Sequence, residues 1–309
     1  MPGASLALRG SIPALVTPFR AGDGELDEPA LGRLAERAVA QGSAAVVVCG
    51  STGEAAAMTA AEQARAIRTV VEAVGRRCPV IAGIGAPCTA GAVALARAAE
   101  RCGADALLCA APPYVKPNQD GLRAHLRAAA GAAALPVVLY DVPARTGVGF
   151  DDDTVARLWE DGVIHALKDA TADLARPTRL RRLCGAELPQ LSGDDATAAA
   201  HLAMGGSGCI SVTANVVPDA CAALQRAWAE GDRDALAALR DGLAPLHEAL
   251  FAESNPIPVK AALGLLGLCD PAPRLPLTRA TEATVRRLDA VLRDFGATGQ
   301  HAAPARRAG

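Results

Sequence analysis

The chain has 309 residues, which suits one large α/β domain or two medium ones and is enough to bury a core. Its 31 basic and 33 acidic residues nearly balance, so there is no electrostatic case for binding nucleic acid or an anionic membrane. The sequence has neither a signal-peptide pattern nor an apolar run long enough to span a bilayer, and we expect a cytoplasmic protein without a membrane partner.

Short apolar and β-branched runs alternate along the chain with longer Ala/Leu/Arg segments of helical spacing. The expected strands lie near residues 11–19, 44–52, 79–85, 106–114, 137–143, 165–171, 189–195 and 208–215. Their starts are about 28 residues apart, the length of one strand plus one crossover helix. Eight such units predict an α/β fold, a (β/α)8 TIM barrel over residues 1–231. An open doubly wound sheet is the alternative, but no GxGxxG motif follows the first strand.

After residue 231 the strand pattern stops. Residues 232–296 contain three segments with helical spacing, at 234–253, 257–268 and 281–295, and they predict a C-terminal helical appendix. Residues 297–309 have no periodicity, and we expect a disordered tail.

Only three of the 31 basic residues are lysines: Lys116, Lys168 and Lys260. Arginine cannot lose its proton and so cannot form an imine, which makes a retained lysine a candidate for chemistry. Lys168 lies in the apolar, strand-like run IHALKDAT. Burial there would favour the neutral amine, a nucleophile toward ketones. A core lysine neutralised by Asp169 explains the same pattern.

Further candidates follow from the rule that reactive groups of a barrel lie at the C-terminal ends of its strands. They are Ser51 and Thr52 in CGSTGE, Tyr114 in PPYVKP, Tyr140 and Arg145 in YDVPARTG, Gly193 in SGDD and Ile210 in the eighth strand. Each alone has an ordinary structural interpretation. Together with Lys168, however, they supply the parts of imine chemistry: an amine, acid/base hydroxyls and a cation for an anionic co-substrate. The only two tyrosines of the chain both fall in this set.

Metal chemistry has little support in the sequence. The nine cysteines form no CxxC pair and no two of the five histidines are four residues apart, so we expect no metal site and mostly buried thiols in a reducing compartment.

The motifs GSTGE, YDVPARTG, ALKDAT, LSGDDA, GGSGCISVTANV and NPIPVKAALGL occur in this order between about residues 10 and 296. In sequence and spacing they resemble the dihydrodipicolinate synthase and N-acetylneuraminate lyase family of class I aldolases. The RTG, KPNQDGL and NPIPVK segments are most similar to the branch that condenses pyruvate with L-aspartate 4-semialdehyde. The resemblance therefore implies a lyase that makes 4-hydroxy-tetrahydrodipicolinate in lysine biosynthesis.

The resemblance also implies roles for individual residues. Lys168 would form the Schiff base with pyruvate, and Tyr140 would be the general acid/base. Ser51 stands where the family usually has threonine, and it would link Tyr140 to Tyr114 of a neighbouring subunit in a proton relay. The assembly implied is a homotetramer, a dimer of dimers.

The remaining site residues would hold the substrates. Thr52 and the Ser51 backbone would bind the pyruvate carboxylate, Gly193 and Ile210 would line its pocket, and Arg145 would clamp the carboxylate of the semialdehyde through its planar fork. No cofactor is expected beyond the covalent imine on Lys168.

Several positions depart from the family pattern or carry no role in it. Asp141 stands where the synthases usually have asparagine, and it either places a charge beside Tyr140 or points away. The positions that bind lysine in feedback-inhibited synthases are here Ala60 or Gln63, Pro87, Gly91 and Pro113. Few polar groups remain there, so weak or absent lysine inhibition is expected. We expect Lys116 and Lys260 to be solvated or helix-associated charges.

Two other functions remain open from the sequence. A pyruvate-dependent aldolase could act on a 2-keto-3-deoxy sugar acid or N-acetylneuraminate, and Asp141 leaves room for a hydroxylated aldehyde. A non-catalytic barrel could instead serve as a pyruvate-binding regulatory protein.

Overall fold

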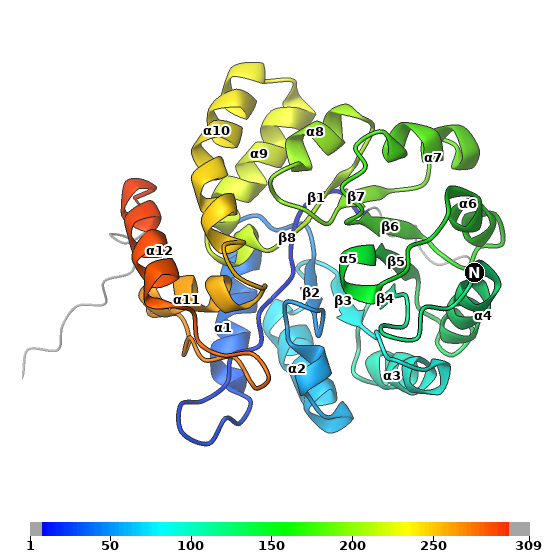
Figure 1. The fold of residues 1–309 in the computed structure, drawn as a ribbon, viewed down its shortest axis with the longest axis horizontal. Helices are drawn as coiled ribbons and strands as arrows, with labels where there is room; N and C mark the ends of the chain where they lie inside the picture. The colour runs from blue at the N-terminus through cyan, green and yellow to red at the C-terminus, as the bar shows by residue number, and fades with distance from the viewer. Residues whose placement is uncertain (1–7, 297–309) are drawn as a thin grey trace, which may run out of the picture.

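The computed structural model describes residues 8–296, and within them eight parallel strands form a ring surrounded by helices (Figure 1). The strands are β1 (Gly10–Pro13), β2 (Val46–Val48), β3 (Val80–Gly83), β4 (Ala106–Ala110), β5 (Val137–Asp141), β6 (Ala166–Asp169), β7 (Gln190–Ser192) and β8 (Gly208–Ser211). Each overlaps one of the eight predicted segments. The observed strands are shorter than predicted because the apolar runs continue into the loops that follow them.

The strands pair in the order of a barrel. β1 pairs with β8, and the pairing then runs through consecutive strands back to β2. The two edges meet at a bridge between Ala14 and Val47, where the Leu15 amide donates to the Val47 carbonyl over 2.9 Å. These contacts confirm the (β/α)8 barrel and exclude the open doubly wound sheet.

Helices cover the outside of the ring. They are α1 (Glu28–Ala40), α2 (Ala60–Val74), α3 (Thr89–Arg101), α4 (Gln119–Ala130), α6 (Asp152–Glu160), α7 (Arg176–Cys184), α8 (Ala198–Ala203) and α9 (Pro218–Glu230). Three short helical turns, η1 (Ala55–Ala57), α5 (Pro143–Thr146) and η2 (Thr213–Asn215), follow β2, β5 and β8. Local chemistry fixes the helix starts: the Asp27 carboxylate accepts from the Ala30 amide, and Thr59 and Glu62 form a capping box.

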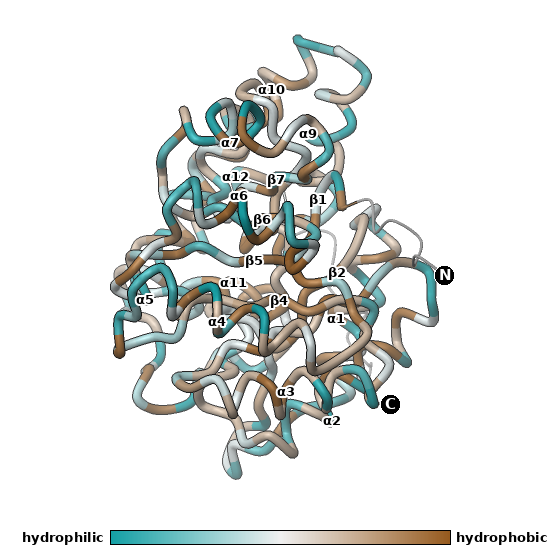
Figure 2. Tube along the Cα trace, turned by 90° about the vertical axis from the view of Figure 1, so that its right-hand side faces the viewer, coloured by the Kyte–Doolittle hydropathy of each residue, from teal (hydrophilic) through white to brown (hydrophobic). Residues whose placement is uncertain are grey.

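Side chains alternate between two layers along each strand. Val138 and Tyr140 of β5 lie in the cluster inside the ring, whereas Val137 and Leu139 lie in the cluster between the strands and the helices. The strands accordingly form a hydrophobic centre in the hydropathy view (Figure 2). This alternation decides which strand residues can face a site inside the barrel.

The chain continues into α10 (Arg233–Leu250), α11 (Ile257–Leu265) and α12 (Glu282–Asp294), which confirms the three predicted helices of the C-terminal appendix. α10 packs against α9, and α11 and α12 pack against α10 and each other (Figure 1). Their apolar faces share one cluster with Val16 and Val212 from the barrel. The predicted disordered tail, 297–309, lies outside the described residues. No helix in the described part is long and apolar enough to cross a membrane.

Candidate active site

Lys168 lies on the inner face of β6, next to Tyr140 of β5. The two residues are register partners, and Leu191 of β7 is the next residue in the same row. Lys168 is 5% exposed, and its Nζ lies 4.2 Å from the centroid of the Tyr140 ring. The prediction of a buried lysine beside a tyrosine is confirmed.

Gly193 and Ile210 complete the surroundings of this lysine. The Gly193 amide donates to the Asp169 carbonyl over 2.6 Å, and a Cβ at Gly193 would lie 3.2 Å from Lys168 Cε and 2.8 Å from Ala170 Cβ. Only glycine therefore leaves the space that the Lys168 side chain occupies. Ile210 is buried in the same interior cluster as Tyr140.

Thr52 and Arg145 are connected through a residue that the sequence analysis did not single out. Asn255 Nδ2 donates to Thr52 Oγ1 over 2.9 Å, and the Asn255 carbonyl accepts from Arg145 Nη2 over 3.0 Å. Asn255 is buried and lies two residues before α11, in the NPIPVK segment, whose motif had given no role for this residue. The C-terminal part of the chain thus positions both predicted carboxylate-binding residues.

Tyr114 and Ser51 lie in loops, unlike Lys168 and Tyr140, which lie on strands. Tyr114 is 94% exposed in the loop after β4 and has a left-handed backbone, with φ of 76°. Its side chain therefore does not pack against Tyr140 of its own chain. Ser51 is half-buried in the loop after β2, where its carbonyl accepts from the Glu54 amide over 3.1 Å.

Asp141 points away from the interior. Its carboxylate is buried on the outer face of β5, where it forms an ion pair with Arg176 at 2.7 Å and accepts from the Phe150 amide at 3.2 Å. This settles the alternative left open by the sequence, because the charge of Asp141 lies behind the strand and not beside the Tyr140 ring.

Lys260 was expected to be a solvated or a helix-associated charge; the second alternative is confirmed and the first is wrong. Lys260 lies on α11 but is fully buried, and its Nζ donates to Glu54 Oε1 over 2.6 Å and to the Thr17 carbonyl over 3.0 Å. It also lies over the Phe19 ring, 4.3 Å from the centroid. Lys116, in contrast, is exposed as expected.

Residues 8–296 contain no group of three or more His, Cys, Asp or Glu side chains placed to hold a metal ion. Five cysteines are buried (Cys49, Cys102, Cys109, Cys209 and Cys221), and Cys88 is exposed. Burial raises the pKa of the Cys109 thiol to about 12, which keeps it protonated at neutral pH. The buried thiols therefore act as small apolar side chains.

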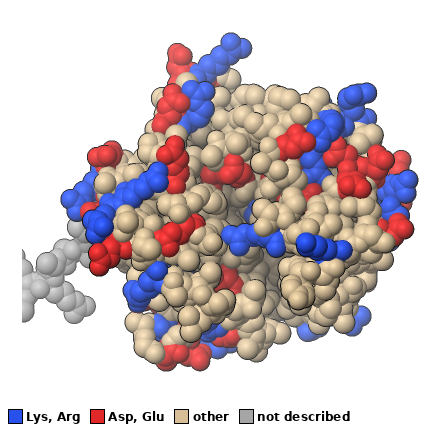
Figure 3. All heavy atoms as spheres, in the orientation of Figure 1, with Lys and Arg blue, Asp and Glu red and all other residues tan. Residues whose placement is uncertain are grey.

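The chemistry of the site is that of an amine held inside a barrel with a phenol beside it. In the view of Figure 3 the molecule is hollowed near its centre, and basic side chains lie at the rim of this hollow. A neutral lysine can attack a ketone, and a phenol can move the protons that this attack requires. Fold and site together define the chain as a (β/α)8 protein with a buried lysine beside a tyrosine inside the barrel.

Comparisons with known proteins show to which family the chain belongs. The chain belongs to the dihydrodipicolinate synthetase family, whose sequence profile matches residues 7–294. It is 48% identical over 285 residues to the 4-hydroxy-tetrahydrodipicolinate synthase of Hyphomonas neptunium, covering 92% of this chain and 97% of that protein. Its identity to the synthase of Acidiphilium cryptum is 45% over 287 residues, covering 93% and 98%.

Solved structures give the same result. The chloride-inhibited dihydrodipicolinate synthase of Acinetobacter baumannii, crystallised with pyruvate, is 41% identical and superposes with a TM-score of 0.89. That comparison covers 93% of this chain and 99% of the solved chain.

Proposed function

We propose that this chain catalyses the condensation of pyruvate with L-aspartate 4-semialdehyde to 4-hydroxy-tetrahydrodipicolinate, a lyase reaction of lysine biosynthesis. One observation carries the proposal most strongly: the interior amine of Lys168 against the Tyr140 ring. The similarity to named synthases over almost the whole chain supports the choice of reaction. We place the reaction in the cytoplasm because these relatives are named for a biosynthetic activity.

The first half of the reaction uses Lys168 and Tyr140. The neutral amine adds to C2 of pyruvate, and the carbinolamine loses water to give an imine. Tyr140 donates and accepts the protons of these steps. Thr52 and the Ser51 backbone hold the pyruvate carboxylate, while Gly193 and Ile210 shape the space around it. The covalent imine takes the place of a metal or cofactor in activating pyruvate.

The second half forms the carbon–carbon bond. Loss of a proton from C3 converts the imine into an enamine, and C3 then attacks the aldehyde carbon of the semialdehyde. Arg145 binds the carboxylate of that substrate from the rim, where it is exposed and oriented by the Asn255 carbonyl. Protonation of the new alkoxide follows, and the amino group contributed by the semialdehyde then attacks C2 of the imine, which closes the ring and displaces the Lys168 amine.

The proton relay requires a second copy of the chain. Tyr114 would enter the site of a neighbouring subunit and meet Ser51, which links it to Tyr140. Its almost complete exposure at the tip of a loop supports such a contact, because a large aromatic side chain gains most from being covered. The proposed assembly is a homotetramer built from two such dimers.

Lysine inhibition is proposed to be weak or absent. The positions that correspond to the lysine-binding residues of feedback-inhibited synthases are Ala60 or Gln63, Pro87, Gly91 and Pro113. Only Gln63 has a side chain with hydrogen-bonding groups, and its amide nitrogen already donates to the Ala55 carbonyl over 2.9 Å. A purified sample should keep its activity in sub-millimolar lysine. Inhibition in that range would contradict the prediction.

Turnover assays with pyruvate and a panel of aldehydes test the proposal. Condensation with L-aspartate 4-semialdehyde should exceed that with sugar aldehydes, since Arg145 suits a compact anionic aldehyde. The reverse preference would instead favour an aldolase of a 2-keto-3-deoxy sugar acid or N-acetylneuraminate. Absence of turnover with every aldehyde would favour the non-catalytic pyruvate-binding barrel.

A further inference from the structure

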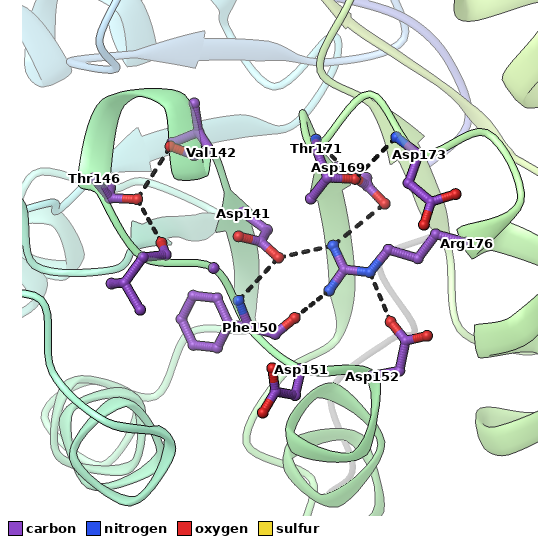
Figure 4. Close-up of polar contacts among 12 residues, drawn as sticks. Asp141, Val142, Thr146, Phe150, Asp151, Asp152, Asp169, Thr171, Asp173 and Arg176 are labelled. Atoms are coloured by element: carbon purple, nitrogen blue, oxygen red, sulfur yellow. Dashed lines mark hydrogen bonds and ion pairs between the residues drawn. The ribbon is translucent and has the colours of Figure 1, made fainter.

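Two carboxylates lie directly behind the two residues of the proposed imine chemistry. Asp141 follows Tyr140 on β5 and Asp169 follows Lys168 on β6, and the two aspartates are register partners. Because side chains alternate along a strand, both aspartates point out of the barrel toward the helices. Figure 4 shows them side by side, facing one guanidinium.

That guanidinium belongs to Arg176, the first residue of α7, which is 3% exposed. Its Nη1 lies 2.7 Å from Asp141 Oδ2 and 3.5 Å from Asp169 Oδ2. Its Nε lies 2.9 Å from Asp152 Oδ1, and its Nη2 donates to the Phe150 carbonyl over 2.7 Å. One side chain therefore ties the ends of two strands to α6, to α7 and to the loop after α5 (Figure 4).

The charges of this cluster depend on Arg176. Burial raises the pKa of the Asp141 carboxyl, and the positive charge of Arg176 opposes that shift. Burial also works against the charge on Arg176, but attraction to Asp169 and Asp141 outweighs it and raises the pKa of the guanidinium. Without Arg176, two buried carboxylates would face each other with no cation between them in residues 8–296.

The inner and outer faces of these strands cannot move independently. A shift of the Asp141 or Asp169 backbone carries the preceding residue with it, because each pair is joined by one peptide unit. Asp169 is held from two more sides, since its Oδ1 accepts from the Thr171 amide over 2.9 Å and its carbonyl accepts from Gly193. The outer cluster thus sets where Tyr140 and Lys168 stand.

We propose that Arg176 is a positioning residue of the reaction: by clamping Asp141 and Asp169 it holds Tyr140 against Lys168 in the geometry that imine formation requires. This inference rests on the proposed function and deepens it. Arg176 does not touch the substrate, and its effect reaches the reacting atoms only through the two strand ends.

Arg176 also balances the charge behind the amine. The groups that face it are Asp141 from β5, Asp169 from β6 and Asp152 from α6, and Asp152 is shared with Arg179. Removing the guanidinium leaves these carboxylates without their shared cation and frees the two strand ends that it holds.

Three variants test the positioning role of Arg176. Arg176→Gln removes the charge, and Arg176→Lys keeps the charge but cannot reach several partners with one planar fork. Arg179→Gln is the matched control, because Arg179 lies one turn along α7 and binds the same Asp152 but is half exposed. If Arg176→Gln does not fold, the double variant Arg176→Gln/Asp141→Asn removes one charge of each sign and takes its place.

The measurement is the rate of pyruvate imine formation per reactive lysine, obtained by borohydride trapping, together with kcat. For Arg176→Lys and Arg176→Gln we expect both rates to fall about 10- to 100-fold, as a displaced reacting group requires. Arg179→Gln should match the wild type.

The inference is overturned if every Arg176 variant keeps the wild-type rate per trapped lysine and the wild-type kcat, with only the melting temperature lowered. The cluster would then serve stability alone. If the wild type itself forms no pyruvate adduct, the proposed function fails, and the positioning role fails with it.

Discussion

The two buried lysines, Lys168 and Lys260, carry the same side chain in opposite surroundings. Lys260 of α11 is fully buried, and its ammonium donates hydrogen bonds to Glu54, in the loop after β2, and to the Thr17 carbonyl. Lys168 is almost as buried, but within residues 8–296 no carboxylate lies within ion-pair distance of its Nζ, and its neighbour is an aromatic ring.

We propose that this difference separates a structural lysine, Lys260, from a reactive one, Lys168. Burial lowers the pKa of Lys260, but attraction to Glu54 opposes the shift and keeps the ammonium engaged. An amine that is ion-paired and hydrogen-bonded has no lone pair to offer to a ketone. Burial alone therefore does not identify a nucleophile, and the partner of the amine is the decisive feature.

The structural lysine still serves the site. Glu54 belongs to the loop that carries Ser51 and Thr52, and α11 begins two residues after Asn255. The Lys260–Glu54 pair thus fastens the C-terminal helices to the loop that is proposed to bind pyruvate.

The largest expected effect is that of Lys168→Met. The variant retains a side chain of similar length but has no amine, so turnover should fall on the order of 10⁴-fold or more, as for removal of other nucleophiles. Its thermal stability should stay near that of the wild type, because no ion pair is broken. Steady-state kinetics and calorimetry check the two halves, and a turnover loss below tenfold would contradict the assigned role.

Lys260→Met should have the opposite effect to Lys168→Met, a large loss of stability with a small loss of turnover. Lys260→Met leaves Glu54 buried without its cation, and we expect the free energy of unfolding to fall by about 3–5 kcal/mol. Glu54→Gln, the matched change in the partner, should also destabilise. Urea unfolding measures the loss, and kcat per borohydride-trapped lysine should fall far less than in Lys168→Met, because the amine of Lys168 remains. A strong loss of kcat at full stability would break the comparison.

A smaller change next to Lys168 sharpens the comparison between the two buried lysines. Gly193→Ala places a methyl group 3.2 Å from Lys168 Cε and 2.8 Å from Ala170 Cβ, so the amine must move. We expect imine formation to slow by about 10- to 100-fold. Gly242→Ala is the control, because that glycine of α10 has no atom within contact distance of the added carbon. Equal rates for the two variants would show that the space around Lys168 is not critical.

The smallest expected effect is the pH dependence of stability that comes from the Arg274–Glu62 ion pair. Arg274 hydrogen-bonds to Glu62 and lowers the pKa of that carboxyl to about 2, against the effect of burial. A lowered pKa in the folded state adds stability above the unfolded pKa near 4.5, and that stability is lost as pH falls toward 2. The advantage of wild type over Glu62→Gln should be less than about 1 kcal/mol at pH 6 and absent at pH 2. Denaturant unfolding at both pH values measures it, and an advantage that grows in acid would contradict the sign.

Sequence periodicity was enough to predict the barrel, because each β/α unit is a local pattern of about 28 residues. The Lys168–Tyr140 neighbourhood followed from the barrel, since adjacent strands place their C-terminal ends together. The direction of Asp141 was also within reach, because strand alternation puts it opposite to Tyr140. These predictions use only neighbouring residues or neighbouring strands.

The contacts that were missed join distant segments. Lys260 pairs with Glu54 across 206 positions, and Asn255 bonds to Thr52 across 203 positions. No local pattern encodes such partners, although the apolar neighbours of Lys260 gave the same burial signal as those of Lys168. The proposed contact of Tyr114 lies beyond one chain altogether.

The most direct test of the central claim is borohydride reduction in the presence of pyruvate, followed by peptide mapping of all three lysines. The account predicts one pyruvate-derived adduct on Lys168 and none on Lys116 or Lys260. An adduct on Lys260, or no adduct at all, would contradict it.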